Sequence, residues 1–251
     1  EMEWFAKKNG DKRSCTGKPK KMGGLPHELG STGFGVYHAA LVATPYVKID
    51  LNKCTVAIEG FGNVGWFAGK FLSEQGSKII AVSDSRGVIY NNRGLNFKKL
   101  DETKKKKGSV TEYGDGVVLP NEKILDIKAD VLVTAAVPDL IKEKDVDRLN
   151  FKMIVEGSNI AMNDSTEELC YRRKILVVPD FVANAGGVIS SYVEYINGKE
   201  KEMFEMVKKK ISTNTKIVLD NSFKNNIKPR DSAMEIAVAR VLKKCKICKV
   251  Q

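Results

Sequence analysis

Short, continuously apolar runs alternate with longer mixed stretches along the middle of the chain. Five of these runs predict β-strands: Cys54–Glu59, Lys78–Val82, Val131–Val133, Met153–Val155 and Ile175–Val178. A strand that is apolar at successive positions is buried on both faces, which is typical of parallel sheets covered by helices on either side. The pattern therefore predicts an α/β fold with a mostly parallel sheet.

Helices are expected around and between these strands, at Ser31–Val47, Asn63–Glu74, Ala183–Ile196, Lys199–Asp220 and Asp231–Lys244. The first of them has Ser31 or Thr32 available as an N-cap, and the last has Asp231. Residues 1–30 are polar and rich in glycine, so we expect them to be irregular. The lysine-rich segment Lys98–Gly116 is interpreted as a solvated excursion from the sheet.

A glycine motif joins the first predicted strand to the helix that follows it. Residues 60–65 read GFGNVG, a GxGxxG pattern, and Asp84 ends the next strand 24 residues beyond Gly60. The first glycine of such a motif permits a tight turn, the second lets the backbone approach a pyrophosphate, and the third lets the helix lie close to the strand. Asp84 is expected to accept hydrogen bonds from the adenosine ribose. In this context the motif predicts a Rossmann-type, doubly wound domain that binds a dinucleotide.

Small or polar residues follow every predicted strand. Each of them could be an ordinary turn residue. The carboxyl ends of the strands line the ligand crevice in an open α/β sheet, so five such endings together favour a binding site. They are Gly60, Ser83-Asp84, Thr134-Ala135, Gly157-Ser158-Asn159 and Asn184-Ala185-Gly186-Gly187.

Composition narrows the function classes. The 251 residues include 42 Lys and Arg against 31 Asp and Glu, a formal net charge of +11, and 42% of them are hydrophobic. This apolar content predicts a folded core. The sequence contains no run of about 18 apolar residues, so it predicts no membrane span. The lysine runs lack interleaved aromatic residues and a nucleic-acid-binding signature, which favours a solvated surface over a nucleic-acid partner.

The cysteines indicate a cytoplasmic protein with reduced thiols, because there are only five and they are scattered. Cys245 and Cys248 form a CxxC pair near the end of the chain. A zinc site needs about four ligands, and no second pair accompanies this one, so no metal site is expected.

Six stretches, spread over nearly the whole chain, carry a resemblance to a known family. They are Thr16–Pro19 (TGKP), His27–Val36 (HELGSTGFGV), Val56–Gly65 (VAIEGFGNVG), Ala81–Gly87 (AVSDSRG), Pro179–Val188 (PDFVANAGGV) with Ser191-Tyr192 and Glu194, and Arg230–Val241 (RDSAMEIAVARV). In this order they resemble the glutamate dehydrogenase family, which includes leucine, phenylalanine and valine dehydrogenases. The resemblance implies the C-terminal NAD(P)-binding domain, with a loop and helix over 1–50, a Rossmann core over 51–198 and C-terminal helices over 199–251.

The resemblance also implies roles for individual residues. Thr32 would contact the nicotinamide amide, Asn159 and Asn184 would border the nicotinamide ribose and carboxamide, and Ser191 would meet the side-chain carboxylate of the substrate. The charge of Asp84 favours NAD, with NADP possible. The predicted cofactor-binding residues are Thr32, Gly60, Phe61, Gly62, Asn63, Val64, Gly65, Ser83, Asp84, Ser85, Thr134, Ala135, Ala136, Asn159 and Asn184.

The substrate domain of the family, with its catalytic lysine and aspartate, precedes this region. Nothing between Glu1 and Gly60 matches it, and the chain does not start with Met, so we expect a fragment that holds no catalytic residue and is inactive alone. The full enzyme would catalyse the reversible NAD(P)-dependent oxidative deamination of L-glutamate to 2-oxoglutarate and ammonia, as a homo-oligomer, typically a hexamer. A branched-chain or aromatic substrate stays open, as does a stand-alone module that binds or senses dinucleotides.

Two departures from the family pattern border the expected cofactor site. Where many members read ANGPTT, residues 158–163 read SNIAMN, which keeps Asn159 and loses the rest. Thr134 stands where a proline is common. Both leave the choice of amino-acid substrate open.

Overall fold

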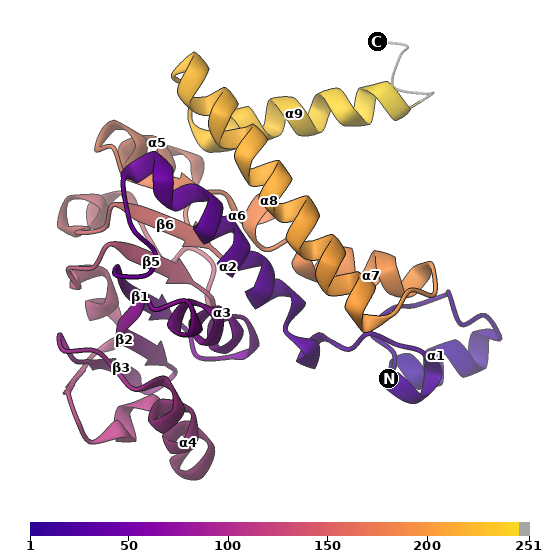
Figure 1. Ribbon diagram of the computed structural model, residues 1–251, viewed down its shortest axis with the longest axis horizontal. Coiled ribbons are helices and arrows are strands. Elements are labelled where there is room, and N and C mark those ends of the chain that lie inside the picture. The colour runs from indigo at the N-terminus through magenta and orange to yellow at the C-terminus, as the bar shows by residue number, and fades with distance from the viewer. Residues whose placement is uncertain (246–251) are drawn as a thin grey trace.

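A seven-stranded sheet with helices on both faces lies at the left in Figure 1, and α7, α8 and α9 lie to its right. The computed structural model describes residues 1–245. The strands lie in the order β4-β3-β2-β1-β5-β6-β7; β2, β1, β5, β6 and β7 run parallel, and antiparallel pairs add β3 and β4 at one edge. The expected Rossmann-type α/β fold is confirmed. The strands are β1 (Thr55–Glu59), β2 (Lys78–Asp84), β3 (Gly87–Tyr90), β4 (Val117–Leu119), β5 (Val131–Thr134), β6 (Met153–Glu156) and β7 (Leu176–Val178).

The long helix α8 crosses one side of the molecule, with α2 lying along it and α9 near its end (Figure 1). Within residues 1–245, no helix combines the length and the apolar content needed to cross a bilayer. The helices are α1 (Met2–Asn9), α2 (Ser31–Ala43), α3 (Asn63–Glu74), α4 (Phe97–Lys107), α5 (Asp164–Arg172), α6 (Asp180–Ala183), α7 (Gly186–Tyr195), α8 (Glu200–Asn225) and α9 (Pro229–Lys244).

The strand order reverses at β1. From β1 the chain moves outward through β2, β3 and β4, then returns to the other side of β1 and continues through β5, β6 and β7. Glu59 of β1 pairs with Thr134 of β5 at the carboxyl ends of the two strands. Connections leave these neighbouring strands in opposite directions, so a ligand crevice is expected at this point.

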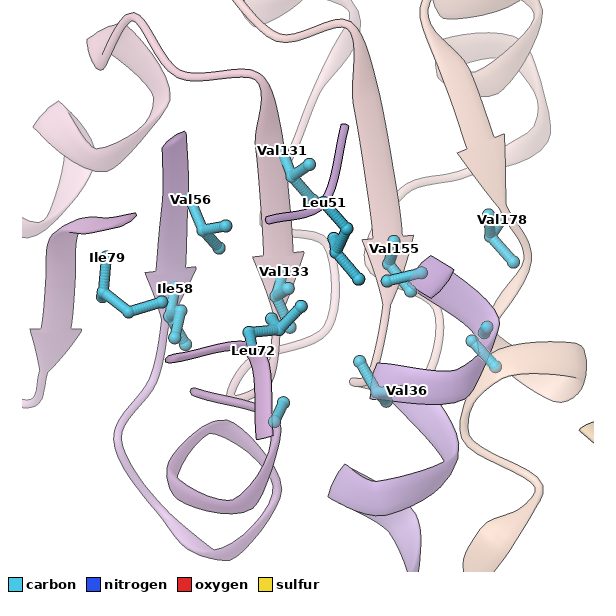
Figure 2. Close-up of a cluster of buried hydrophobic side chains, with 14 of the residues drawn as sticks. Val36, Leu51, Val56, Ile58, Leu72, Ile79, Val131, Val133, Val155 and Val178 are labelled. Atoms are coloured by element: carbon cyan, nitrogen blue, oxygen red, sulfur yellow. The ribbon is translucent and has the colours of Figure 1, made fainter. Parts of the chain in front are cut away.

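Side chains of the parallel strands divide between two cores. Val56 and Ile58 of β1 join the core under α2, α3 and α8, whereas Ala57 between them joins the core on the opposite face. Figure 2 shows the first core, with Val36 of α2 and Leu72 of α3 among the strand valines and isoleucines. Both faces exclude water, which explains why the strands are apolar at successive positions.

The predicted N-cap and the predicted end of the helix that starts at Ser31 are both wrong. The N-cap of α2 is Gly30, with φ 78°, rather than Ser31 or Thr32, because the N–H of Phe34 already donates to the carbonyl of Gly30 at 3.0 Å. This helix ends at Ala43 and continues as a 3₁₀ turn over Thr44–Val47.

The C-terminal helices also differ from the prediction. Helix α9 begins at Pro229 and not after a cap at Asp231, since proline has a helical φ and no N–H that would be left unpaired. The expected single helix over Ala183–Ile196 is two, α6 and α7, with a break at Asn184 and Ala185. Helix α8 runs five residues past the predicted end at Asp220, because no glycine or proline stops it before Asn226.

Two segments expected to lack structure contain helices. Residues 1–30 include α1 and two short 3₁₀ turns. The segment Lys98–Gly116 contains most of α4 and a 3₁₀ turn at Val110–Tyr113, and Leu100 and Val110 are fully buried. It is therefore anchored to the sheet rather than a free excursion. The division into 1–50, 51–198 and 199–251 stays a prediction.

Candidate functional site

The glycine motif forms a tight turn from β1 into α3. Gly60 has φ 91°, and a Cβ atom on Gly65 would lie only 1.8 Å from the carbonyl oxygen of Gly60. Gly62 is the N-cap of α3; no side chain caps this helix, and a Cβ on Gly62 would meet nothing within 4 Å. Helix α3 therefore begins beside open space at Gly62 and without a side-chain cap, and uncapped helix starts are typical phosphate-binding sites.

A cavity of about 820 Å³ opens beside this turn, at the carboxyl ends of β1, β2 and β5. Its volume is in the range of sites for small molecules and cofactors. Asn63, Val64 and Gly65 lie in the first turn of α3 and do not line it. The predicted residues that do line it are Gly60, Phe61, Gly62, Ser83, Asp84, Ser85, Ala135 and Ala136.

Positive side chains that were not predicted as site residues also line this cavity. They are Lys104, Lys142, Lys144 and Arg148. Such charges suit the phosphates of a dinucleotide. A signal for Lys104 was present: it lies four residues after the fully buried Leu100 on the same helix, so it is on the face of α4 that turns toward the sheet.

The carboxylate of Asp84 is held by four donors of its own chain. Oδ1 accepts from the Arg86 N–H at 2.9 Å and the Ser109 hydroxyl at 3.1 Å; Oδ2 accepts from Lys104 Nζ at 2.6 Å and the Val110 N–H at 2.8 Å. Burial opposes ionisation, but these hydrogen bonds, led by that of Lys104, outweigh it and lower the pKa of Asp84. Asp84 therefore anchors α4 to the end of β2 at the cavity wall.

Glu59 is a second carboxyl group at this site. From the sequence it was predicted only as the last residue of a strand. It is buried, and one oxygen accepts the N–H groups of Ala135 and Ala136, both at 3.0 Å. Burial raises its pKa, against the effect of these hydrogen bonds. Glu59 thus shapes the turn after β5. A signal for Glu59 was present in the sequence, because it is a charged residue at the end of an otherwise apolar strand.

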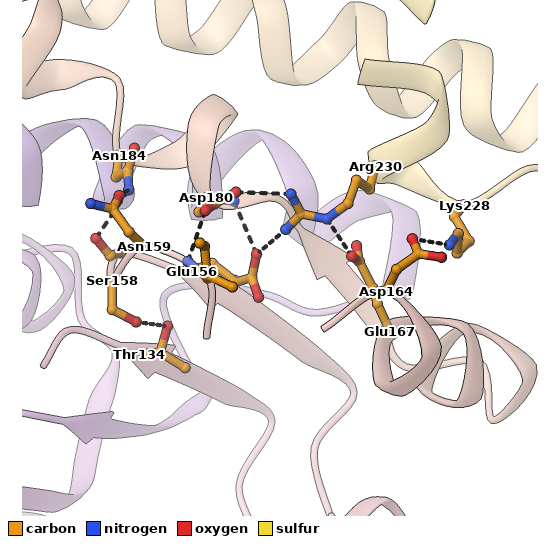
Figure 3. A network of polar contacts seen from close by, with 12 residues as sticks. Thr134, Glu156, Ser158, Asn159, Asp164, Glu167, Asp180, Asn184, Lys228 and Arg230 are labelled. Carbon is orange, nitrogen blue, oxygen red and sulfur yellow. Dashed lines mark hydrogen bonds and ion pairs between the residues drawn. The ribbon is translucent and has the colours of Figure 1, made fainter. Parts of the chain in front are cut away.

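The structure brings a second group of predicted residues together beyond the ends of β5 and β6 (Figure 3). The Asn184 amide donates to Asn159 Oδ1 at 2.7 Å, and the Ser158 hydroxyl donates to Thr134 Oγ1 at 3.0 Å. Thr32 lies beside the start of α7, since a Cβ on Gly187 would be 3.0 Å from its Oγ1. Asn159, Asn184 and Thr32 come from three elements, and none of them lines the cavity beside the glycine turn.

Helix α7 carries Ser191, which is partly exposed, and Glu194, which is buried. Glu194 forms an ion pair with Lys18 and accepts the N–H groups of Gly17 at 2.9 Å and Leu25 at 2.8 Å. The TGKP segment is therefore fixed to the helix that carries Ser191.

A buried cluster of charges lies next to the two asparagines (Figure 3). Arg230 of α9 contacts Glu156 at 2.8 Å, Asp180 at 3.0 Å, and Glu167. Burial and the neighbouring carboxylate of Glu167 raise the pKa of Glu156 to about 8, although Arg230 lowers it. One guanidinium thus faces three carboxylates at the end of β6.

Other hollows in residues 1–245 lie away from the glycine turn. A larger hollow of about 1420 Å³ lies between α7, α8 and α9, but it includes neither the glycine turn nor the strand ends. Cys15, Cys54 and Cys170 are free thiols. Within residues 1–245 no three His, Cys, Asp or Glu side chains are grouped to hold a metal ion. Cys248, half of the CxxC pair, lies outside the described residues.

The family model and the related sequences that match this chain all belong to one family of amino-acid dehydrogenases. The family model described as glutamate/leucine/phenylalanine/valine dehydrogenase matches residues 23–247. The glutamate dehydrogenase of Aeropyrum pernix is 38% identical over 98% of this chain and 63% of its own length. That of Thermotoga maritima is 39% identical over 90% and 56%, and the NADP-specific enzyme of Saccharolobus shibatae is 38% identical over 92% and 56%. The chain thus spans little more than half the length of these relatives.

Solved structures match over nearly the whole chain. Glutamate dehydrogenase from Peptoniphilus asaccharolyticus superposes with a TM-score of 0.78 at 27% identity, covering 97% of this chain and 62% of that one. The Leu-bound hetero-hexameric glutamate dehydrogenase from Thermus thermophilus has a TM-score of 0.87 at 22% identity, covering 100% and 61%. The latter likeness supports the fold.

Proposed function

The chain belongs to the glutamate/leucine/phenylalanine/valine dehydrogenase family, and from this premise we propose that it is the nicotinamide-dinucleotide-binding part of a glutamate dehydrogenase. The observation that carries the proposal is the uncapped start of α3 at Gly62, which opens onto a cavity at the point where the strand order reverses. Glutamate is preferred as the substrate because relatives at 38–39% identity are named glutamate dehydrogenases. The alternative, a module that only binds dinucleotides, shares the same site.

The proposal gives each part of the crevice a role. The N–H groups of α3 hold the pyrophosphate, the wall with Asp84 and Lys104 faces the adenosine ribose, and Asn159 and Asn184 border the nicotinamide. A bound nicotinamide would supply the site with a hydride acceptor for the α-carbon of the amino acid. The lysine and aspartate of the reaction would belong to the remaining part of the full protein, which would assemble as an oligomer, typically a hexamer.

Titration with NADH and NADPH tests the proposal. Quenching of tryptophan fluorescence should be saturable for at least one of them, because Trp66 lies in α3 just behind the phosphate-binding turn. Far-UV circular dichroism establishes that the chain is folded under the same conditions. A folded chain that binds neither dinucleotide would overturn the proposed function.

We further propose that the site accepts NADP as well as NAD, since Lys104 compensates the charge of Asp84 at 2.6 Å. Asp84→Ser removes a negative charge and releases Lys104 to pair with a 2′-phosphate. The ratio of NADPH to NADH affinity should then rise about tenfold, the equivalent of about 1.4 kcal/mol. Both dissociation constants are measured by fluorescence titration.

The control is Asp115→Ser, which removes the same charge from an exposed carboxylate paired with Arg93 at 3.4 Å, away from the cavity wall. It should leave the ratio unchanged. An unchanged ratio in the Asp84 variant as well would mean that Asp84 does not face the ribose.

A further inference from the structure

The loop after β6 contains a strained residue beside Asn159. Ile160 has φ 51°, a left-handed conformation that is unfavourable for a β-branched side chain. Its side chain is 60% exposed, so burial does not offset the strain. Such a conformation persists only where surrounding contacts enforce it.

Two hydrogen bonds enforce the backbone of Ile160. Its N–H donates to Asp180 Oδ2 at 2.9 Å, and its carbonyl accepts the N–H of Asp139 at 2.8 Å. Asp139 lines the cavity and has φ 50° itself. The strained turn therefore bridges the cavity wall and the carboxylate of Asp180.

Arg230 holds both segments that carry the asparagines (Figure 3). It contacts Glu156, three residues before Asn159, at 2.8 Å, and Asp180, four residues before Asn184, at 3.0 Å. The two segments are also joined directly, because the N–H of Asp180 donates to Glu156 Oε2 at 3.0 Å. The N–H of Asn184 in turn donates to the carbonyl of Asp180 at 2.7 Å. One guanidinium from α9 therefore fixes the base of both asparagine-bearing segments.

We propose that Arg230 is a positioning residue that acts through Asp180 and Glu156 to hold Asn159 and Asn184 in place for the nicotinamide end of the dinucleotide. The inference rests on the proposed function and adds to it a role for α9, which does not line the cavity beside the glycine turn. The strained backbone of Ile160 is then maintained by its hydrogen bond to Asp180, which Arg230 holds in place. The pyrophosphate turn follows β1 and Asp84 ends β2, so neither lies on the two segments that Arg230 contacts.

The test compares NADH with ADP-ribose, which has the same adenosine and pyrophosphate but no nicotinamide. In Arg230→Gln, NADH affinity should fall about five- to tenfold, comparable to losing one hydrogen bond, while ADP-ribose affinity stays within about twofold. Isothermal titration calorimetry measures both. Asp180→Ala should give the same selective loss, and it leaves Arg230 paired with Glu156 and Glu167 if the first variant fails to fold.

Lys228→Gln is the matched control, because Lys228 is a buried cation beside the start of α9. It pairs with Asp164 at 2.6 Å and with Asp231 at 3.6 Å, and not with Glu156 or Asp180. It should leave the ratio of the two affinities unchanged. Equal losses for both ligands in a folded Asp180→Ala variant would show a purely structural role and overturn the inference alone. Absence of binding of both ligands to the unsubstituted chain would overturn the proposed function together with it.

Discussion

Gly65→Ala is expected to destroy the phosphate-binding turn, whereas Gly62→Ala is expected to weaken dinucleotide binding and leave the fold intact. A Cβ on Gly65 would lie 1.8 Å from the carbonyl oxygen of Gly60 and 3.2 Å from Ile58 Cγ2. Rotating a side chain cannot relieve the first contact, because it is with the backbone. Overpacking of this kind costs about 1–3 kcal/mol, and more where the backbone must move.

Gly62 is the opposite case. Its φ of −85° is open to alanine, and the added methyl group would meet no atom of the chain within 4 Å. The methyl group would instead occupy the space through which a pyrophosphate approaches α3. We therefore expect the melting temperature of Gly62→Ala to match that of the unsubstituted chain, and its dissociation constant for NADH to rise about tenfold or more.

Thermal unfolding and NADH titration of the two variants separate these effects, and each variant serves as the control for the other. Unchanged NADH binding by Gly62→Ala would show that the dinucleotide does not approach the turn. An unchanged melting temperature for Gly65→Ala would contradict the close contact between Gly65 and Gly60.

The parallel strands and the glycine turn could be predicted from the sequence because their signals are local. Buried strands are apolar at successive positions, and the turn needs glycine at fixed spacing. β4 gave no such signal, because Val117 and Val118 are more than half exposed at the sheet edge. β3 carried the apolar signal in the buried Val88 and Ile89 and was nevertheless not predicted. Helix α4 was hidden by its lysines, although Leu100 is fully buried.

The partners within the site could not be predicted, because they are far apart in the sequence. Asp84 meets Lys104 across 20 residues, and Arg230 meets Asp180 and Glu156 across 50 and 74. Only the folded sheet brings these groups together. The conformation of Ile160 was equally hidden, since a β-branched residue is the opposite of the usual signal for a left-handed backbone.

The other large effect is expected at the buried ion pair of Lys18 and Glu194. Their side chains are only 4% and 1% exposed. Glu194 also accepts the N–H groups of Gly17 and Leu25, and Lys18 Nζ also donates to the carbonyl of Cys15 at 2.7 Å. This single pair therefore joins the segment before α2 to the end of α7.

Lys18→Met should lower the free energy of unfolding by about 3–5 kcal/mol at neutral pH, the typical cost of leaving one charge of a buried pair without its partner. Urea denaturation followed by circular dichroism measures it. Lys20→Met is the matched control two residues away. Lys20 pairs with Glu200 at 3.1 Å on the surface, with both side chains about half exposed or more, so its loss should cost at most about 1 kcal/mol.

The pH dependence of this loss identifies its cause. Burial opposes ionisation of Glu194, but Lys18 and the N–H groups outweigh it and lower its pKa. A carboxyl group with a lowered pKa in the folded state stabilises the fold above its unfolded pKa, and this contribution disappears as the pH falls through the folded pKa. Without Lys18 most of that contribution is absent at every pH.

The difference in unfolding free energy between the unsubstituted chain and Lys18→Met should therefore be largest near pH 7 and become smaller as the pH falls. A difference that is independent of pH, or no larger than that of Lys20→Met, would show that Glu194 does not depend on Lys18 for its charge.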